Sequence, residues 1–504
     1  ARLAARAPIS LDDVRDLELL IRANHPLIVL ETEETERVEP LTHWVAGELG
    51  LPLHGWAPDR GLFRPDLPAF TVEGSAEPLK CLDYMLQGKA ESLYYLDGFI
   101  TKLEDALVVH KLCEVAQRFA DNRSAVLMTA PTLDLPAPLL RLATSLRLSP
   151  PSAQQYYDFV RELLADLRRR MPVKVALTGE QVAQLLAQLQ GLSMFEVKKV
   201  LTKVIVEDGS FTAEDIPRIA EAKKQIIERS GVLEYFAADE RMAEVAGLRN
   251  LKDWLSKRKP AFTEPLRAKK FGLAPPRGVL LIGVQGCGKS MCAKAIAKEW
   301  GLPLIRLDPS NLYNKFYGES EKNLKRATRT AEAMAPIVLW IDEMEKAFAQ
   351  GGQDDSGTSA RIFATFLSWM QEKKASVFVV ATCNDISKLP PELVRKGRFD
   401  EIFFVDLPDA AARKTILGVH LTRRGRDPGA FDIDTLAART EGFSGAELEQ
   451  VVVSALYSAF AKGPELRTED LLEEISRTVP LSTTMAERIS DLRAWAKSRT
   501  VPAD

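Results

Sequence analysis

Apolar residues in the first 149 positions fall into short continuous runs that alternate with longer, helically spaced stretches. Continuous apolar runs are typical of strands that are covered on both faces, whereas spacings of three and four residues indicate amphipathic helices. We therefore predict strands at 26–31, 92–97 and 125–129, and helices at 37–49 and 103–120. Strands that alternate with helices favour a parallel sheet with crossover helices.

The next stretch, residues 150–225, has helical apolar spacing throughout. Val182, Leu185 and Leu189 lie on one face of one predicted helix, and Val197, Val200 and later residues repeat the spacing on the next. We predict a small all-helical unit.

The α/β pattern then returns, and a second helical stretch follows it, over roughly 410–497. Predicted strands of the second α/β part lie at 279–282, 304–307, 337–341, 377–381 and 402–405. We thus predict four parts: an α/β domain at 1–149, a helical unit at 150–225, a larger α/β domain with its linker at 226–408, and a helical domain at 409–504.

Composition agrees with a folded chain of several domains. The chain has 504 residues, 46% of them hydrophobic and 27% charged, with a net charge of -3. An acidic pI near 6.2 without a basic stripe argues against a nucleic-acid motor. No apolar run reaches the length of about 18 residues that a membrane span needs, so we expect no membrane partner.

The cysteines and the first residues bear on the compartment. Ala1–Ser10 contains two arginines without a long apolar core, so we expect no secretory signal. The five cysteines are scattered and form no CxxC pair, which predicts free thiols in a reducing, cytoplasmic setting.

The strongest chemical signal directly follows the predicted strand 279–282. The sequence there is Gly283-Val284-Gln285-Gly286-Cys287-Gly288-Lys289-Ser290, followed by Met291 and a predicted helix, and it fits G-x-x-x-x-G-K-[ST]. Glycines let successive backbone N–H groups face phosphates, and the helix N-terminus favours negative charge. Lys289 would add a point charge and Ser290 a Mg2+ ligand. We predict an ATP site here, with Cys287 tending toward thiolate so that its alkylation would block ATP binding.

Two further strands end in polar residues that suit the same site. The strand 337–341 ends in Asp342 and Glu343, and a buried strand that ends in two carboxylates needs a cation or proton to offset them. We predict that Asp342 holds Mg2+ and that Glu343 polarises the attacking water. Asn384, after the strand 377–381, would contact that water and the γ-phosphate.

The order of these motifs resembles that of the AAA+ ATPases, and of their classical AAA clade in particular. It continues with Arg395-Lys-Gly-Arg398-Phe-Asp and then Gly442-Phe-Ser-Gly445-Ala446-Glu. The resemblance implies a homohexamer in which Arg395 and Arg398 complete the site of a neighbouring subunit; by charge alone both would be solvated surface residues. Gly445 and Ala446 match the second sensor position of that clade.

The segment Val245-Ala-Gly247-Leu248 is similar to a loop that lies beside adenine in the clade, or it is an ordinary turn that starts a helix. A closer resemblance covers almost the whole chain. Segments such as Leu339-Trp-Ile-Asp-Glu and Phe366-Leu-Ser-Trp-Met-Gln-Glu-Lys look like the family called hypothetical chloroplast reading frame forty-six. The fold class is then α/β, an AAA+ P-loop ATPase module with a helical lid.

The N-terminal half is similar to a degenerate AAA module, with 150–225 as its lid; an unrelated α/β partner domain is the alternative. After the strand 26–31 the chain reads Thr32-Glu-Glu-Thr-Glu36, where a phosphate loop would stand. Without glycines or a lysine, and with glutamates that repel phosphate, this half should not bind ATP in the usual way.

Phe316 and Tyr317 occupy the position of the clade's pore loop, where an aromatic grips a threaded polypeptide; alternatively the rings pack in an interface. The stretch 351–357 is either a second pore loop or a disordered segment. We therefore predict a motor that remodels an unidentified protein partner, or else a nucleotide-switched scaffold that binds a regulator. No HExxH motif is present, so any degradation would need a separate protease.

Overall fold

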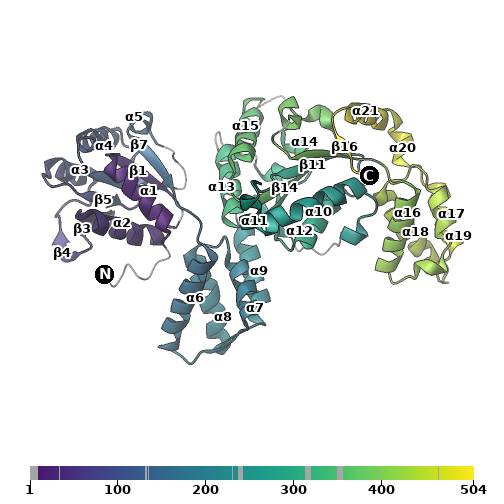
Figure 1. Cartoon of the computed structure of the whole chain (residues 1–504), viewed down its shortest axis with the longest axis horizontal. Coiled ribbons are helices and arrows are strands. Elements are labelled where there is room, and N and C mark those ends of the chain that lie inside the picture. Colours follow the sequence, from purple (N-terminus) through teal and green to yellow (C-terminus); the bar gives the residue numbers. More distant parts are fainter. Residues whose placement is uncertain are drawn as a thin grey trace. The chain divides into compact units, whose positions relative to one another are not determined.

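The computed structural model describes residues 9–32, 34–130, 133, 135–229, 231–236, 242–312, 319–348, 356–395, 397–463 and 465–504. The chain divides into two compact units, Ala1–Lys223 and Lys224–Asp504. Figure 1 draws both units, coloured along the sequence, with many of their helices and strands labelled. None of the helices within these ranges has the length and apolarity that a membrane crossing requires.

The first unit is built on a seven-stranded sheet of order β4-β3-β2-β5-β6-β1-β7. Alternate residues of β1 pack on opposite faces: Leu27 and Val29 contact the core under α3 and α4, whereas Ile28 and Leu30 contact the core under α1 and α2. This explains the continuous apolar run that predicted the strand. Its elements are α1 (Leu11–Arg22), β1 (Leu27–Glu31), α2 (Thr35–Leu49), β2 (Leu53–Ala57), β3 (Gly61–Arg64), β4 (Leu67–Thr71), α3 (Pro78–Gln87), β5 (Leu93–Leu96), α4 (Ala106–Phe119), β6 (Ala125–Ala130), α5 (Ala137–Leu140) and β7 (Ala143–Arg147).

The helical part that follows is not all-helical as we predicted. It contains α6 (Ala153–Arg168), α7 (Gly179–Leu189), α8 (Met194–Asp208) and α9 (Asp215–Glu228), but also a parallel pair of three-residue strands, β8 (Lys174–Ala176) and β9 (Ser210–Thr212). Strands this short cannot show a period of two in the sequence, and β8 is exposed along its length.

The second unit has a sheet of order β10-β12-β13-β14-β11-β15-β16. Its elements up to the lid are β10 (Leu233–Phe236), α10 (Arg249–Thr263), α11 (Pro265–Lys270), β11 (Gly278–Gly283), α12 (Lys289–Trp300), β12 (Leu304–Leu307), α13 (Glu319–Ala333), β13 (Ile337–Ile341), α14 (Met344–Phe348), α15 (Ser356–Glu372), β14 (Val377–Cys383) and β15 (Glu401–Val405). Val279 and Leu281 of β11 face the core with α10 and α12, and Leu280 and Ile282 face the core with α13 and α15.

The two sheets share one parallel arrangement. Each sheet contains five adjacent parallel strands. Counted one to five in chain order, they lie in the order second, third, fourth, first, fifth: β2-β5-β6-β1-β7 in the first unit and β12-β13-β14-β11-β15 in the second. The first strand therefore lies between the fourth and the fifth in both. The N-terminal unit thus has the AAA-like arrangement that we predicted, and an unrelated α/β fold does not explain it.

The C-terminal elements form a helical lid and then return to the sheet. Helices α16 (Ala410–Arg423), α17 (Ile433–Arg439), α18 (Gly445–Lys462) and α19 (Thr468–Arg477) share one apolar core. After α20 (Leu481–Thr484), helix α21 (Ala486–Ala496) packs Leu492 and Trp495 against the core of the large sheet, and β16 (Val501–Pro502) pairs with β15. The sequence pattern predicted the helices but not this return.

Candidate functional site

The phosphate loop connects β11 to α12 and is shaped by its glycines. Gly286 and Gly288 both have left-handed backbone, with φ of 77° and 84°. A Cβ on Gly286 would lie 3.0 Å from the Ala446 Cβ and 3.0 Å from the Ser444 Oγ, so a side chain there would press against the lid and strain a left-handed backbone. The lid is tied to the loop there, because the Ala446 N–H donates to the Gly286 carbonyl at 3.0 Å.

Lys289 is held by its own loop. Its Nζ donates to the carbonyl oxygens of Gly283 at 2.9 Å and Val284 at 2.7 Å. The side chain is buried, and this burial lowers the pKa of the ammonium. A bound phosphate would therefore offer the cation a partner of full charge in place of two carbonyl dipoles.

Asp342 connects the phosphate loop to the neighbouring strand. Its Oδ1 accepts from the Ser290 hydroxyl at 2.9 Å and from the Thr382 hydroxyl at 2.6 Å. A serine hydroxyl beside a carboxylate is the small oxygen donor set that Mg2+ uses when phosphates and water supply its other ligands, so these two residues fit the ion. Thr382 was not among the site residues predicted from the sequence, although its place near the end of strand β14, directly before Cys383 and Asn384, was a usable signal.

Glu343 and Asn384 meet as the motif order implied. The Asn384 Nδ2 donates to Glu343 Oε1 at 3.2 Å, and Lys346 forms an ion pair with the other carboxylate oxygen. Glu343 has a φ of 49°, uncommon for a residue with a side chain, and its N–H donates to the Thr382 hydroxyl at 2.9 Å. Strained backbone of this kind is often found where a side chain must be aimed.

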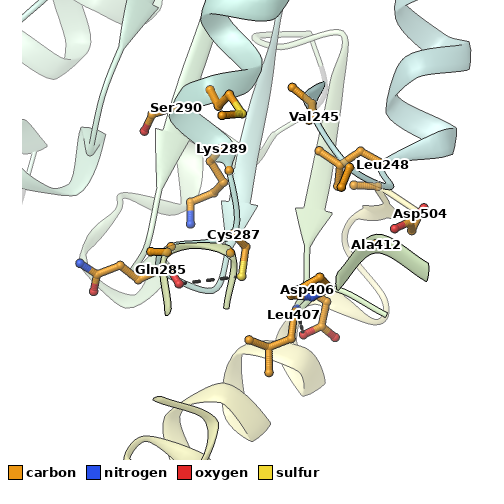
Figure 2. A pocket seen from close by; sticks show the side chains of 18 of the residues that line it. Val245, Leu248, Gln285, Cys287, Lys289, Ser290, Asp406, Leu407, Ala412 and Asp504 are labelled. Atoms are coloured by element: carbon orange, nitrogen blue, oxygen red, sulfur yellow. Dashed lines mark hydrogen bonds between the residues drawn. The ribbon is translucent and has the colours of Figure 1, made fainter. Parts of the chain in front are cut away.

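These groups open into one pocket of about 820 Å³. Figure 2 shows Ser290 and Lys289 on one side of it and Val245, Leu248 and Asp504 on the other. Three of the predicted nucleotide-site residues do not line the pocket. Gly247 lies next to the carboxylate of Asp504, and the carbonyl oxygens of Gly283 and Val284 accept from Lys289. The other proposed nucleotide-site residues line the pocket: Val245, Gln285, Gly286, Cys287, Gly288, Lys289, Ser290, Met291, Asp342, Glu343, Asn384, Gly445 and Ala446.

The two arginines lie away from this pocket. Asp400 accepts from the N–H groups of Arg277 at 2.6 Å and Gly278 at 3.0 Å, which ties their segment to the amino end of β11. The phosphate loop follows the carboxyl end of the same strand. Arg395 is exposed, whereas Arg398 is half-buried. With the side-chain amide of Gln371 oriented so that its oxygen faces Arg398, that oxygen accepts from the Arg398 Nη2 at 3.2 Å. Neither arginine lines the pocket of its own chain.

The expectation that Cys287 tends toward thiolate is wrong. All five cysteines are free thiols, and burial raises the pKa of the Cys287 thiol to about 11, although the Lys289 ammonium lowers it in part. Loss of solvation of the thiolate outweighs the helix N-terminus.

Alkylation of Cys287 should consequently be slow at pH 8, where about one thiol in a thousand is ionised. We expect the rate with iodoacetamide to rise about tenfold per pH unit between pH 8 and 10. Peptide mass spectrometry over a pH series measures this rate. ATP binding is measured on the alkylated protein, and Cys287→Ser treated in the same way is the control for alkylation at other cysteines. A rate already at its plateau at pH 8 would show that the thiolate is stabilised after all.

The proposed pore residues, Phe316 and Tyr317, lie outside the described residues, as does most of the stretch 351–357. Their roles stay predictions.

The N-terminal unit has a region that corresponds to the phosphate loop and lid of the second unit. There, carboxylates of the segment after β1 contact the start of helix α8. The segment Gly191-Leu-Ser-Met-Phe-Glu196 precedes and enters α8 as Gly442-Phe-Ser-Gly-Ala-Glu447 enters α18, and Ser193 and Ser444 each form a capping box with the glutamate three residues later. In the first unit the Phe195 N–H donates to Glu36 Oε1 at 3.2 Å, and Glu34 accepts from the Met194 N–H.

Buried Arg37 completes this arrangement. Its Nη1 donates to Glu34 at 2.6 Å and its Nη2 to the Ser149 carbonyl at 2.9 Å. Burial raises the pKa of Glu34, and Arg37 lowers it in part. Side-chain carboxylates therefore hold the start of α8 at the place where the second unit offers a phosphate loop.

Comparison with family models places AAA modules along the chain. Residues 279–407 match the model described as ATPase family associated with various cellular activities (AAA), and 430–474 match an AAA+ lid domain. Residues 13–148 and 154–230 match the N-terminal and second domains of SpoVK-like AAA ATPases.

Some relatives are similar to nearly the whole chain, and others to only part of it. The uncharacterized AAA domain-containing protein ycf46 of Pyropia yezoensis is 36% identical over 96% of this chain and 97% of its own length. The proteasome-activating nucleotidase of Aeropyrum pernix is 37% identical over 42% of this chain and 52% of its own length. The cell division cycle protein 48 homolog of Archaeoglobus fulgidus is 32% identical over 58% of this chain and 42% of its own length.

Proposed function

This chain belongs to the ycf46 family of AAA domain-containing proteins, and from that premise we propose that it is a Mg2+-dependent ATPase motor that assembles as a homohexamer and remodels a protein partner. The observation that carries the proposal is the convergence of Lys289, Ser290, Asp342 and Glu343 on one pocket beneath the lid. A site with this set of groups can hydrolyse a nucleoside triphosphate rather than only bind it.

The chemistry follows from the contacts. Lys289 would exchange its loop carbonyls for the phosphates, and Ser290 with Asp342 would hold Mg2+, which neutralises charge that develops on the phosphoryl oxygens. Glu343 would polarise the attacking water, with its carboxylate oriented by Asn384. Residues at the opposite edge of the sheet, Arg395 and Arg398, would complete the site of the next subunit in a ring.

The remodelling part of the proposal is supported by the partial similarity to proteins named proteasome-activating nucleotidase and cell division cycle protein 48 homolog. One observation favours the alternative, a nucleotide-switched scaffold without threading. The N-terminal unit holds its own helices through protein carboxylates, as a stable platform for a regulator would.

Capture on a trapped variant distinguishes the two functions. Glu343→Gln should retain ATP and stay bound to whatever it acts on, so the variant is isolated from native lysate with ATP and its companions are identified. Lys289→Ala, which should not hold ATP, is the control. A protein enriched on the trap alone, whose addition accelerates hydrolysis by the unmodified chain and not by Phe316→Ala, supports remodelling. Enrichment of the chain itself alone supports the scaffold.

A further inference from the structure

The residues Arg493–Asp504, here called the C-terminal segment, form part of the wall of the nucleotide pocket. Seven of them line it: Arg493, Ala496, Lys497, Thr500, Pro502, Ala503 and Asp504. Apolar residues of the loop before α10 and of lid helix α16 line the same pocket, among them Val245, Leu248, Ile416 and Val419. An apolar slot with a polar rim suits a flat heterocyclic base, and it lies away from Ser290 and Lys289 (Figure 2).

The start of α10 depends on this segment for its hydrogen bonds. Leu248 occupies the N-cap position with left-handed backbone, φ 56°, and has no side-chain oxygen to cap the helix. The carboxylate of Asp504 takes that role: its Oδ1 accepts from the Arg249 N–H at 3.2 Å and from the Arg249 Nε at 3.2 Å. These hydrogen bonds contribute to a lowered pKa of Asp504, against its partial burial.

The main chain of the segment supplies the other two bonds. The Ala503 carbonyl accepts from the N–H groups of Asn250 at 3.0 Å and Leu251 at 3.1 Å. The first three N–H groups of α10 are thus satisfied by residues about 250 positions away, where most helices use their own N-cap side chain. A Cβ on Gly247 would lie 2.4 Å from Asp504 Oδ2, so the glycine makes room for the carboxylate.

We propose that the C-terminal segment is a working part of the nucleotide site, in which Asp504 positions the loop Val245–Leu248 against the base of bound ATP. The strained Leu248 backbone keeps its place because Asp504 holds it, and Val245 and Leu248 then present their side chains to the slot. Asp504 is a positioning residue and does not touch the phosphates. A second attachment lies nearer the lid, where Arg493 forms a two-point pair with Asp406 at 2.8 Å.

The test separates the base from the phosphates, and it rests on the proposed ATPase function. In a Glu343→Gln background, which prevents turnover, calorimetric titrations compare ATP with inorganic tripolyphosphate, a ligand that has no base. Asp504→Ala should weaken ATP binding about tenfold and leave tripolyphosphate within about twofold, because only the base end loses its fixed wall. Asp504→Asn keeps an acceptor oxygen and should recover most of the affinity.

Asp491→Ala is the control, because Asp491 is an exposed carboxylate on helix α21, two residues before the C-terminal segment begins, and does not line the pocket. Unchanged ATP binding in Asp504→Ala, or equal weakening of both ligands, would overturn the inference while leaving the proposed function intact. If the Glu343→Gln parent itself binds no ATP, the proposed function fails, and the inference fails with it.

Discussion

Glu343→Gln should slow ATP hydrolysis by about 10²- to 10⁴-fold, the range that a positioned general base contributes, while ATP affinity stays within about threefold of the unmodified chain. The physical reason is that glutamine preserves the shape of the side chain but cannot accept a proton from the attacking water. Glu343 makes no contact with Lys289 among the hydrogen bonds of the described residues, so the groups that grip phosphate remain in place.

Two measurements check this expectation: steady-state phosphate release, and titration with a fluorescent ATP analogue. Lys289→Ala provides the opposite pattern, because it removes the cation that faces the phosphates and should lose binding itself. Asn384→Ala should fall between the two in hydrolysis, since it leaves Glu343 in place but frees its carboxylate to turn. If Glu343→Gln hydrolyses ATP at more than a tenth of the normal rate, another group is the base.

Arg395→Ala and Arg398→Ala should each lower kcat by up to about 10³- to 10⁵-fold with ATP binding largely retained, because an arginine supplied in trans acts on the transition state. The structure supports action in trans, since the segment is tied to the amino end of β11 and the phosphate loop lies beyond its carboxyl end. Exposed Arg395 has the freer side chain; Arg398 is held against Gln371.

Mixing two inactive variants makes this prediction sharp. A site composed of an Arg395→Ala chain and a Glu343→Gln neighbour has an intact glutamate and an intact arginine. In rings assembled at random from equal amounts, roughly a quarter of the sites have this composition, so about a quarter of normal activity should return. A mixture no more active than its components would place the arginines outside the neighbour's site, or the chains outside a ring.

The sequence predicted what short segments can encode. The central strands β1, β5 and β6 of the first unit and β11 to β15 of the second could be found because each contains a continuous apolar run, and the phosphate loop because its glycines and lysine lie close together in the sequence. Strands β2, β3, β4, β7 and β10 were not predicted, since polar residues or glycines interrupt their apolar positions. The AAA+ fold and the resemblance to the ycf46 family are confirmed by the strand order and by a relative that matches nearly end to end. Asp342, Glu343 and Asn384 were placed by motif order, and the structure brings them into one pocket.

Contacts between distant residues could not be predicted. Asp504 and Arg249 are 255 positions apart, and no local pattern marks a carboxylate that will cap a remote helix. The two-residue strand β16 and the three-residue strands β8 and β9 are too short for a periodicity. The thiolate prediction for Cys287 was wrong for a similar reason, because burial depends on the packing of the lid and of α21 around the loop, which composition does not reveal.

The contact between Glu36 and the start of α8 has a consequence for how the chain responds to metabolism. A domain whose closure depends on a nucleotide changes its population of states with the ratio of ATP to ADP. In the N-terminal unit the start of α8 is instead held by the side chain of Glu36, which is part of the chain and is always present. We therefore expect the closed state of the N-terminal unit not to change with the ratio of ATP to ADP, in contrast to that of the second unit.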